Sequence, residues 1–385
     1  MAYYTNNGTI KIRIRLKYAP LYSGVSNLTH PIKNRAPQKG REMKKIIPQL
    51  AFTVAAVFAA GFSATSTAAA DEIKLRFAHS FPTSHFIQKQ AIEPWMENVT
   101  KLTDGQVTFD HFPAQQLGKS KDMLALTQNG VTDIGYVGVS YVSDKMPLSG
   151  VAQLPGSFAT SCQGTNAYWE IANKDPIAKQ DFADNKVRLL FSFVLEPYQI
   201  YTANKKVMTA ADAEGLKLRS TGGAMDIFTR KIGAIPVRMT ATETRESLSR
   251  GTLDGIIFPN QSVISYDLVP LVKYGTRGGN FGSFVVTFVM NEDAWGKLPE
   301  DAQKALTTAS EEMVTEMCKN VDEGVENAIA EMQKAGVEYH ELSTSDLETF
   351  TKYSDEVAEE WAKDLDDRGK PGNEVLTQFQ SALSK

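Results

Sequence analysis

The sequence predicts an α/β protein made of two lobes and a long connecting helix. Three observations carry this prediction. Strand-like and helix-like segments alternate between residues 72 and 139, which is typical of a layered sheet. A similar helix, glycine and strand recur near residues 240–258, and residues 300–335 form an almost unbroken helical pattern. Two such lobes, with strands entering from each side, would enclose a cleft suited to a ligand.

The front of the chain predicts export. Lys44 and Lys45 form a positive start, residues 50–62 are an apolar run without charge, and small residues precede Asp71. This pattern is typical of a secretory signal peptide, here 43–70, and it predicts a periplasmic protein. The alternative is a membrane anchor, but the apolar run is short for a span of ~20 residues.

Charge separates the leader from the rest of the chain. Residues 1–42 are basic and lack apolar periodicity, so we expect a non-native upstream extension that is disordered if it is made. Residues 1–70 hold ten of the 41 basic residues and one of the 45 acidic ones, which leaves the remainder with 13 excess acidic side chains. Such a protein is a poor partner for nucleic acid or anionic lipid.

The predicted first lobe begins with alternating strands and helices. The expected strands are 72–78, 106–112, 133–139 and 186–194. The expected helices are one that contains Trp95 and ends near residue 102, and one over 121–129. About 315 residues follow the leader, which fits one large domain or two lobes.

The predicted second lobe repeats part of this plan. Leu126, Gly130 and Asp133 have counterparts in Leu248, Gly251 and Asp254, with a spacing that differs by one residue. In both segments a helix ends at a glycine that can adopt positive φ, and a short turn leads into a strand. The segment 240–243 (TATE) has the pattern of a capping box before the second helix.

Residues 300–335 predict one long helix, with Gly324 as its only strong breaker. A helix of that length would run ~50 Å and could touch both lobes as a spine. The alternative is a dimerising coiled coil, but sustained apolar heptads are lacking, so we expect a monomer. A strand near 336–340 and acidic helices through residue 384 complete the chain.

Motifs for catalysis or metal binding are absent from the sequence, which contains no P-loop, GxSxG, HExxH or paired CxxC motif. His79 and His85 follow the first strand at a spacing that is unusual for zinc. We therefore predict no catalytic residue, no metal and no cofactor. His79 is a candidate for the cleft, and for His85 a solvent-facing loop position is the simpler expectation.

Only two cysteines, Cys162 and Cys318, occur in the chain. Export to an oxidising compartment permits a disulfide. Their distance in space does not follow from the sequence, so a bridge and two buried thiols remain equal alternatives.

The strongest candidate for a binding site is the segment 215–223. It predicts a short strand that delivers Arg219 to a turn with Ser220, followed by a helix from about Ala224. Free N–H groups at a helix start favour an anion, and a guanidinium fork matches a carboxylate. The alternative is an ordinary strand arginine in a surface ion pair. A second strand ends at Phe258 and leads to Asn260, which we also place in the pocket.

Short segments in a fixed order show that the chain resembles the solute-binding proteins of tripartite ATP-independent periplasmic (TRAP) transporters over about residues 72–370. The segments are 75–79 (LRFAH), 112–118 (FPAQQLG), 130–133 (GVTD), 202–205 (TANK), 215–219 (GLKLR), 233–239 (GAIPVRM), 251–255 (GTLDG) and 298–300 (LPE). The resemblance implies a two-lobed, periplasmic-binding-protein-like fold with a hinge and a spine helix. It also implies that Arg219 holds a ligand carboxylate.

The resemblance also bears on specificity. Family members often carry a second arginine where this chain has Gln199, so a second charged clamp is not expected. Some members that bind sugar acids have an asparagine where this chain has Phe258, which favours a ligand with an apolar or ring-bearing body. Plain core packing is an equal alternative for Phe258. Tyr136, on a predicted buried strand, completes the candidate set.

The expected function is capture of a small organic acid between the lobes and delivery to TRAP permease subunits in the membrane. We expect lobe 1 to comprise 71–196 and 285–325, and lobe 2 to comprise 197–284 and 326–385 with the C-terminal helices. The alternatives are a secreted lyase or hydrolase, which would need a positioned acid or base, and a ligand sensor that uses the same cleft.

Overall fold

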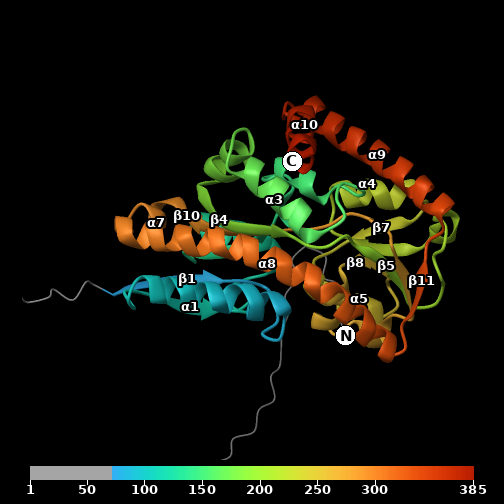
Figure 1. The fold of residues 1–385 in the computed structure, drawn as a ribbon, viewed down its shortest axis with the longest axis horizontal. Helices are drawn as coiled ribbons and strands as arrows, with labels where there is room; N and C mark the ends of the chain where they lie inside the picture. The colour runs from blue at the N-terminus through green and yellow to red at the C-terminus, as the bar shows by residue number, and fades with distance from the viewer. Residues whose placement is uncertain (1–71) are drawn as a thin grey trace, which may run out of the picture. The chain divides into compact units, whose positions relative to one another are not determined.

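A computed structural model describes residues 72–385 and contains two β-sheets with helices packed on them (Figure 1). The predicted α/β fold with a long helix is therefore confirmed. The predicted signal peptide at 43–70 and the upstream segment 1–42 lie outside the described residues.

The first sheet has five strands in the order β2–β1–β3–β10–β4. Their bounds are Ile73–Ala78 (β1), Val107–Phe112 (β2), Ile134–Gly138 (β3), Val187–Val194 (β4) and Val285–Asn291 (β10). β1 pairs in parallel with β2 and β3, whereas β10 runs antiparallel between β3 and β4. All seven residues of β10 are buried, so a late segment of the chain forms the interior of this sheet.

Of the helices and turns around the first sheet, the two that were predicted, one with Trp95 that ends near residue 102 and one over 121–129, are found as α1 (Glu93–Leu102) and α2 (Met123–Gln128). The others are the π-helix η1 (Gln88–Ile92), η2 (Ser120–Asp122), η3 (Val139–Val142), η4 (Leu148–Gln153), α3 (Ser161–Ala172), η5 (Ala178–Phe182), η6 (Ala183–Asn185) and α7 (Glu292–Trp295). Trp95 on α1 is fully buried and its indole N–H donates to Ser310 at 3.1 Å. This bond fixes α1 against the long helix α8 (Glu300–Lys334).

The second sheet has six strands in the order β11–β9–β5–β8–β6–β7. Their bounds are Gln199–Thr202 (β5), Lys217–Ser220 (β6), Ile235–Arg238 (β7), Gly255–Phe258 (β8), Tyr274–Arg277 (β9) and Glu338–Glu341 (β11). The accompanying helices are η7 (Ala210–Ala213), α4 (Ala224–Lys231), α5 (Ala241–Ser249), α6 (Asn260–Ser265) and η8 (Val269–Leu271). The predicted capping box before α5 is confirmed, because the Thr240 N–H donates to Glu243 at 2.9 Å.

The predicted internal repeat has a structural counterpart in the two sheets. Gly130 and Gly251 follow α2 and α5 with φ of +65° and +66°, values that glycine adopts without the strain imposed by a Cβ. Asp133 and Asp254 then each accept a backbone N–H from the neighbouring parallel strand at 2.8 Å, from Arg76 and Lys217 respectively. The same turn therefore joins helix to strand in both sheets.

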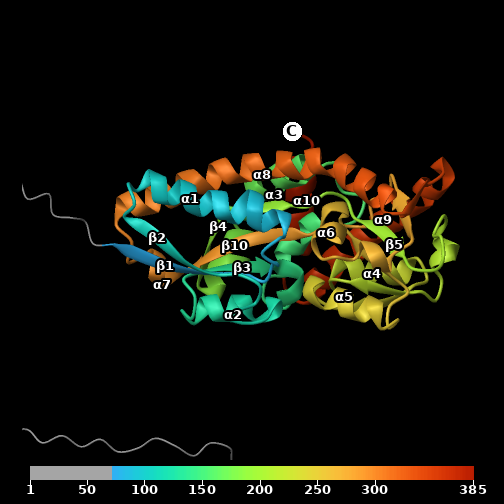
Figure 2. The ribbon, with the colours of Figure 1, turned by 90° about the horizontal axis from the view of Figure 1, so that it is seen from below.

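The 35-residue helix α8 contacts elements of both sheets (Figure 2). It packs against β4, α1 and α3 of the first group and against α6 of the second. Gly324 lets the Gln261 side chain lie directly against α8, because a Cβ at this position would lie 2.3 Å from that side chain. The Gln261 amide donates to the Val321 carbonyl at 2.9 Å. The predicted spine helix, expected over 300–335, is confirmed, and it ends one residue earlier than predicted.

A disulfide joins Cys162 on α3 to Cys318 on α8. Beside it, the Asp322 carboxylate accepts the backbone N–H groups of Ser161 and Cys162 at 2.6 and 3.0 Å. Of the two alternatives that the sequence left open for the cysteines, the structure thus has the bridge, and it anchors the start of α3 to the spine.

The chain ends in α9 (Thr344–Asp367) and α10 (Gly372–Leu383). α9 packs on α4, and α10 packs on α9, α3 and η4, so the C-terminal helices contact elements that accompany both sheets. The lobe boundaries given above stay a prediction.

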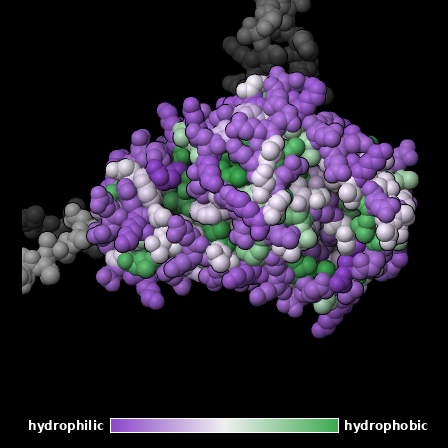
Figure 3. Space-filling view, turned by 45° about the horizontal axis from the view of Figure 1, so that its top comes forward, coloured by the Kyte–Doolittle hydropathy of each residue, from purple (hydrophilic) through white to green (hydrophobic). Residues whose placement is uncertain are grey.

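The face shown in Figure 3 is mostly hydrophilic, with apolar residues in small scattered groups. Among residues 72–385, no helix combines the length and the apolar character that crossing a membrane requires.

Candidate ligand-binding site

Arg219 is a buried cation on β6, the strand next to the edge strand β7 of the second sheet. It lies on β6 between β7 and β8, and its side chain is 1% exposed. Its Nη atoms donate to the Ile257 carbonyl and the Tyr141 hydroxyl at a long 3.4 Å, and its Nε has no acceptor. It forms no salt bridge with any residue in 72–385, which excludes the surface ion pair considered for it.

The guanidinium faces a cavity with aromatic walls. The lining residues are Phe81, His85, Ile87, Tyr136, Tyr141, Leu195, Tyr198, Arg219, Ala241, Phe258, Pro259, Ser262, Tyr266, Phe284 and Val286. Arg219 is the one charged side chain among them. The cavity has an open volume of about 20 Å³, which is room for about one water molecule.

Phe258 both packs in the core and faces the cavity. It is 1% exposed and its ring lies 6.0 Å from that of Tyr266. The Arg219 guanidinium carbon lies 4.7 Å above the same ring, which is a cation–π distance. The two alternatives for Phe258 are therefore compatible, because the ring that packs on Tyr266 also forms the floor beneath the arginine.

Tyr141 connects the two sheets across the cavity. It belongs to η3, directly after β3, and its hydroxyl accepts hydrogen bonds from the Ala241 N–H at 3.1 Å and from Arg219 at 3.4 Å. Both contacts are acceptor contacts, so the hydroxyl hydrogen of Tyr141 remains available to a ligand.

Three further tyrosines, Tyr136, Tyr198 and Tyr266, line the cavity, and their hydroxyls form no hydrogen bond with another residue of the described chain. Burial raises the pKa of all three well above the usual value, so the hydroxyls stay protonated. They can therefore act as donors or acceptors toward a ligand.

His85 is a buried residue of the cavity wall, and the expectation of a solvent-facing position is wrong. It has no exposed surface, and its ring packs 4.8 Å from Phe86 and 4.8 Å from Tyr266. Burial, helped by neighbouring His79, lowers its pKa to about 3, so the ring is neutral. The apolar residues that follow it, Phe86 and Ile87, were the sequence signal for burial.

His79 lies beside this site but not on the cavity. Its Nε2 is 2.7 Å from His111 Nε2, and its Nδ1 accepts the Phe81 N–H at 3.2 Å. Burial and the neighbouring His111 lower its pKa to about 3. Both ring nitrogens are thus used within the protein.

Ser220 does not join Arg219 at the cavity, because consecutive residues of a strand point to opposite faces of the sheet. Its hydroxyl donates to the Asp226 carboxylate and accepts the Gly222 N–H at 3.2 Å. An acidic side chain of the protein therefore occupies the start of α4, where the sequence suggested a ligand anion.

Gln199 and Asn260 line a separate groove between the β4–β5 connection and α8. The Gln199 amide donates to the Gly279 carbonyl at 2.6 Å and accepts from Thr276 at 3.0 Å. Asn260 accepts from the Tyr201 hydroxyl at 2.6 Å.

Of the seven predicted site residues, Arg219, Phe258 and Tyr136 line the aromatic cavity. Sequence reasoning missed Tyr141, Tyr198, Tyr266 and His85.

Glu196 is a buried acid in that groove, at the connection between the sheets. It is 2% exposed; its Oε1 lies 3.5 Å from the Gln261 N–H, and its Oε2 has no partner. Burial raises its pKa from 4.5 to about 7. Between a pH of about 4.5 and about 7, Glu196 is protonated in the folded protein but ionised in the unfolded chain. Its contribution to the free energy of unfolding therefore falls as the pH rises through that interval.

We expect Glu196→Gln to gain stability relative to the parent over that pH interval, by up to about 3 kcal/mol, since one pKa unit corresponds to about 1.4 kcal/mol. Urea unfolding of both proteins at a series of pH values measures the difference, in which shared contributions from the histidines cancel. Glu323→Gln, at an exposed position of α8, is the control and should give a flat difference. A flat profile for Glu196→Gln would contradict the assignment.

No group of three or more His, Cys, Asp or Glu side chains in 72–385 has the geometry of a metal site. The cavity instead offers one fixed positive charge, several neutral hydroxyls and aromatic surface. This arrangement suits a small anion with an apolar body.

Comparison with known proteins shows similarity to bacterial solute-binding proteins. Residues 77–364 match the family model described as bacterial extracellular solute-binding protein, family 7. The C4-dicarboxylate-binding periplasmic protein DctP of Rhodobacter capsulatus is 26% identical over 306 residues, which cover 76% of this chain and 88% of that protein.

Two solved structures are similar over most of the chain. A TRAP solute-binding protein from a marine metagenome, specific for aromatic acid ligands and crystallised with 3-hydroxybenzoate, has a TM-score of 0.77 and 25% identity over 82% of this chain and 98% of that one. A TRAP solute-binding protein from Rhodoferax ferrireducens with copurified benzoate has a TM-score of 0.76 and 23% identity over 81% and 98%.

Proposed function

The chain belongs to bacterial extracellular solute-binding protein family 7, and we propose that it captures a ring-bearing monocarboxylic acid at Arg219 and delivers it to a TRAP permease in the membrane. The observation that carries this proposal is a guanidinium that is 1% exposed and has no anionic partner in the described chain. A buried charge without a partner is costly, and a ligand carboxylate is the partner that its fork geometry fits.

The cavity favours one carboxylate rather than two. Arg219 is the single charged residue of its wall, and Gln199, at the position where a second clamp was considered, bonds to the protein outside the cavity. A second carboxylate would lose its hydration without gaining a cation. Despite similarity to a C4-dicarboxylate-binding protein, the site therefore suits a monocarboxylate.

Aromatic walls favour a ring as the body of the ligand. Phe81, Tyr136, Tyr198, Phe258 and Tyr266 surround the space in front of Arg219. Aromatic rings prefer offset or edge contacts with other rings, and such pairs add to the free energy of burial. The aromatic acids bound by the two similar solved proteins support this class of ligand.

Capture requires the walls of the cavity to move, because about 20 Å³ does not accommodate an aromatic ring. Tyr141 contacts Ala241 across the cavity, and outside the cavity Arg238 of β7 donates to the Ser140 carbonyl of η3 at 2.9 Å. We expect these contacts to separate in an open form and to re-form around the ligand. Closure would exclude water and strengthen the attraction between Arg219 and the carboxylate.

The residues of the cavity support ligand binding better than catalysis. Burial lowers the pKa of His85, the one histidine on the cavity wall, to about 3, so near neutral pH it is only a weak proton acceptor. A ligand sensor would use the same cavity, and uptake of the acid by a reconstituted permease in the presence of the protein distinguishes transport from sensing.

Titration calorimetry of the purified protein tests the proposed function. We expect benzoate, phenylacetate, 3-hydroxybenzoate or mandelate to bind with one-to-one stoichiometry and to raise the melting temperature as ligand exceeds Kd. Succinate, a dicarboxylate without a ring, is the control and should bind weakly or not at all. Preference for succinate over every aromatic acid would contradict the proposal.

We further propose that the mature protein begins at or near Asp71, after the small residues of the 43–70 leader. Support comes from β1, which starts at Ile73 and so leaves a very short lead before the first strand. N-terminal sequencing of the protein from the periplasm checks this. A mature start at Met1, or recovery of the protein only with the membrane, would contradict export by cleavage.

A further inference from the structure

One polar atom of the cavity wall has no role in carboxylate binding or in the fold. The Nε2 atom of His85 is buried and has no hydrogen-bond partner in the described chain. Buried polar atoms without partners are uncommon in folded proteins, and those in a binding cavity often mark a position that a ligand group fills.

The other ring nitrogen determines what this atom can bind. His85 Nδ1 accepts the backbone N–H of Ile87 at 3.2 Å, so Nδ1 carries a lone pair and the proton of the neutral ring lies on Nε2. The Nε2–H group is therefore a donor, and its partner must be an acceptor. Unlike a tyrosine hydroxyl, it cannot reverse its role by rotating a hydrogen.

The carboxylate of the ligand does not need this donor. Arg219 Nε has no partner, and the contact of its Nη2 with Tyr141 is long at 3.4 Å, so one edge of the guanidinium can take both carboxylate oxygens. The donor on His85 is then left for a second oxygen of the same ligand.

We propose that His85 selects, among ring-bearing carboxylates, those that carry an additional neutral oxygen acceptor such as a hydroxyl. This inference rests on the proposed function and names the substrate class more narrowly. An acid without that oxygen would leave the Nε2–H group buried and unbonded, and sites of this kind discriminate strongly against analogues that lack the bonding group.

The test compares affinities for benzoate with those for 2-, 3- and 4-hydroxybenzoate, and for phenylacetate with those for mandelate and 3-hydroxyphenylacetate. We expect at least one hydroxylated acid to bind about ten-fold or more tightly than its parent acid. Equal affinities in both series would overturn the inference while leaving the proposed function intact. Failure of every aromatic acid to bind would overturn both.

Two substitutions assign the preference to one atom. Asparagine can place an acceptor near the position of Nδ1 but does not reach the position of Nε2, whereas glutamine can place a donor near Nε2. His85→Asn should reduce the preference for the hydroxylated acid to about one, and His85→Gln should restore part of it. A preference that persists unchanged in His85→Asn would overturn the inference.

His79→Asn is the matched control. His79 also accepts a backbone N–H two residues ahead of it, from Phe81, but lies off the cavity. Its substitution tests the loss of a buried histidine without the loss of the cavity donor, so the preference should stay as in the parent. If a His85 variant does not fold, the parent's own affinity ratios decide the outcome.

Discussion

Arg219→Ala is expected to abolish detectable binding of the carboxylate ligand. In a closed cavity the carboxylate would be left without its partner, at a cost on the order of 3–5 kcal/mol, which corresponds to a loss of affinity of roughly 10²–10³-fold or more. Arg219→Lys should also weaken binding, because an ammonium group is a point charge and cannot reproduce the planar fork. Titration calorimetry with the aromatic acid that the parent binds best is the measurement.

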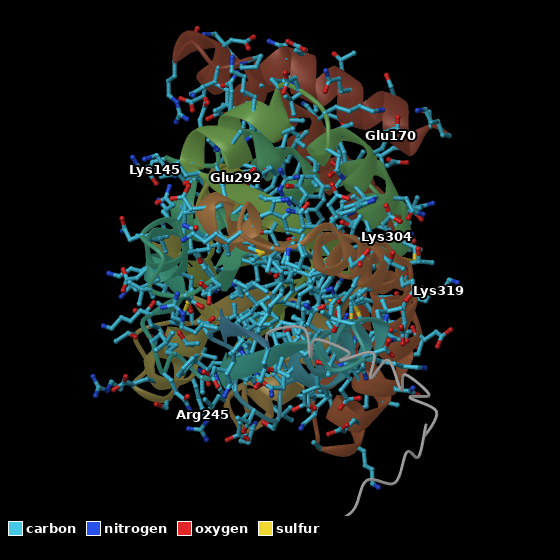
Figure 4. The ribbon with its side chains drawn as sticks, turned by 90° about the vertical axis from the view of Figure 1, so that its left-hand side faces the viewer. Lys145, Glu170, Arg245, Glu292, Lys304 and Lys319 are labelled. Atoms are coloured by element: carbon cyan, nitrogen blue, oxygen red, sulfur yellow. A yellow bond between two sulfur atoms is a disulfide. The ribbon has the colours of Figure 1, made fainter. Side chains whose placement is uncertain are left out.

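Arg245→Ala is the control for loss of an arginine in the same part of the chain. Arg245 lies on α5 at the outside of the molecule (Figure 4). Its side chain is 51% exposed and pairs with Asp267 at 2.7 Å. It should leave affinity unchanged, and Gln199→Ala should cost far less than Arg219→Ala because Gln199 bonds to the protein. If Arg219→Ala binds as tightly as the parent, the assignment of the pocket is wrong.

Loss of the disulfide is expected to have the largest effect on stability. Cys162 and Cys318 are 156 residues apart in the sequence, and a cross-link over so long a loop removes much of the conformational entropy of the unfolded chain. The chain-entropy model gives about 5 kcal/mol, and native disulfides typically contribute 2–5 kcal/mol. The double variant Cys162→Ala with Cys318→Ala should therefore unfold at a clearly lower urea concentration.

Reductant supplies the control for this experiment. Dithiothreitol should lower the unfolding midpoint of the parent toward that of the double variant and leave the double variant unchanged. Two reactive thiols in the denatured, unreduced parent would show that the bridge does not form, and equal midpoints for parent and double variant would show that it does not stabilise the fold.

Much of the fold could be predicted because its signals are local. The long helix, expected over 300–335, is found at Glu300–Lys334, and the predicted capping box stands before α5. The helix-ending glycines Gly130 and Gly251 adopt the positive φ that their turns require. Helix periodicity, caps and turns depend on residues within a few positions of one another, so a single sequence contains them.

The candidate site could be predicted only in part, because its residues come from distant segments. Arg219 was found because a strand, an arginine and a glycine turn stand together in the sequence. Tyr141, Tyr198 and Tyr266 follow different strands, and nothing in their local sequence places them around one cavity. Ser220, next to Arg219 in the sequence, lies on the other face of the sheet because strands alternate.

The sequence by itself thus determined the alternating strands and helices over 72–139, the long helix, the candidate leader and the arginine that we expect to hold the ligand. The tertiary structure decided three other features: the pairing of Cys162 with Cys318, the aromatic wall opposite Arg219, and the burial of His85 with an unbonded donor. The physical reason is the same in each case. Burial, pairing and hydrogen-bond satisfaction depend on which distant segments pack together, and a single sequence does not specify those contacts.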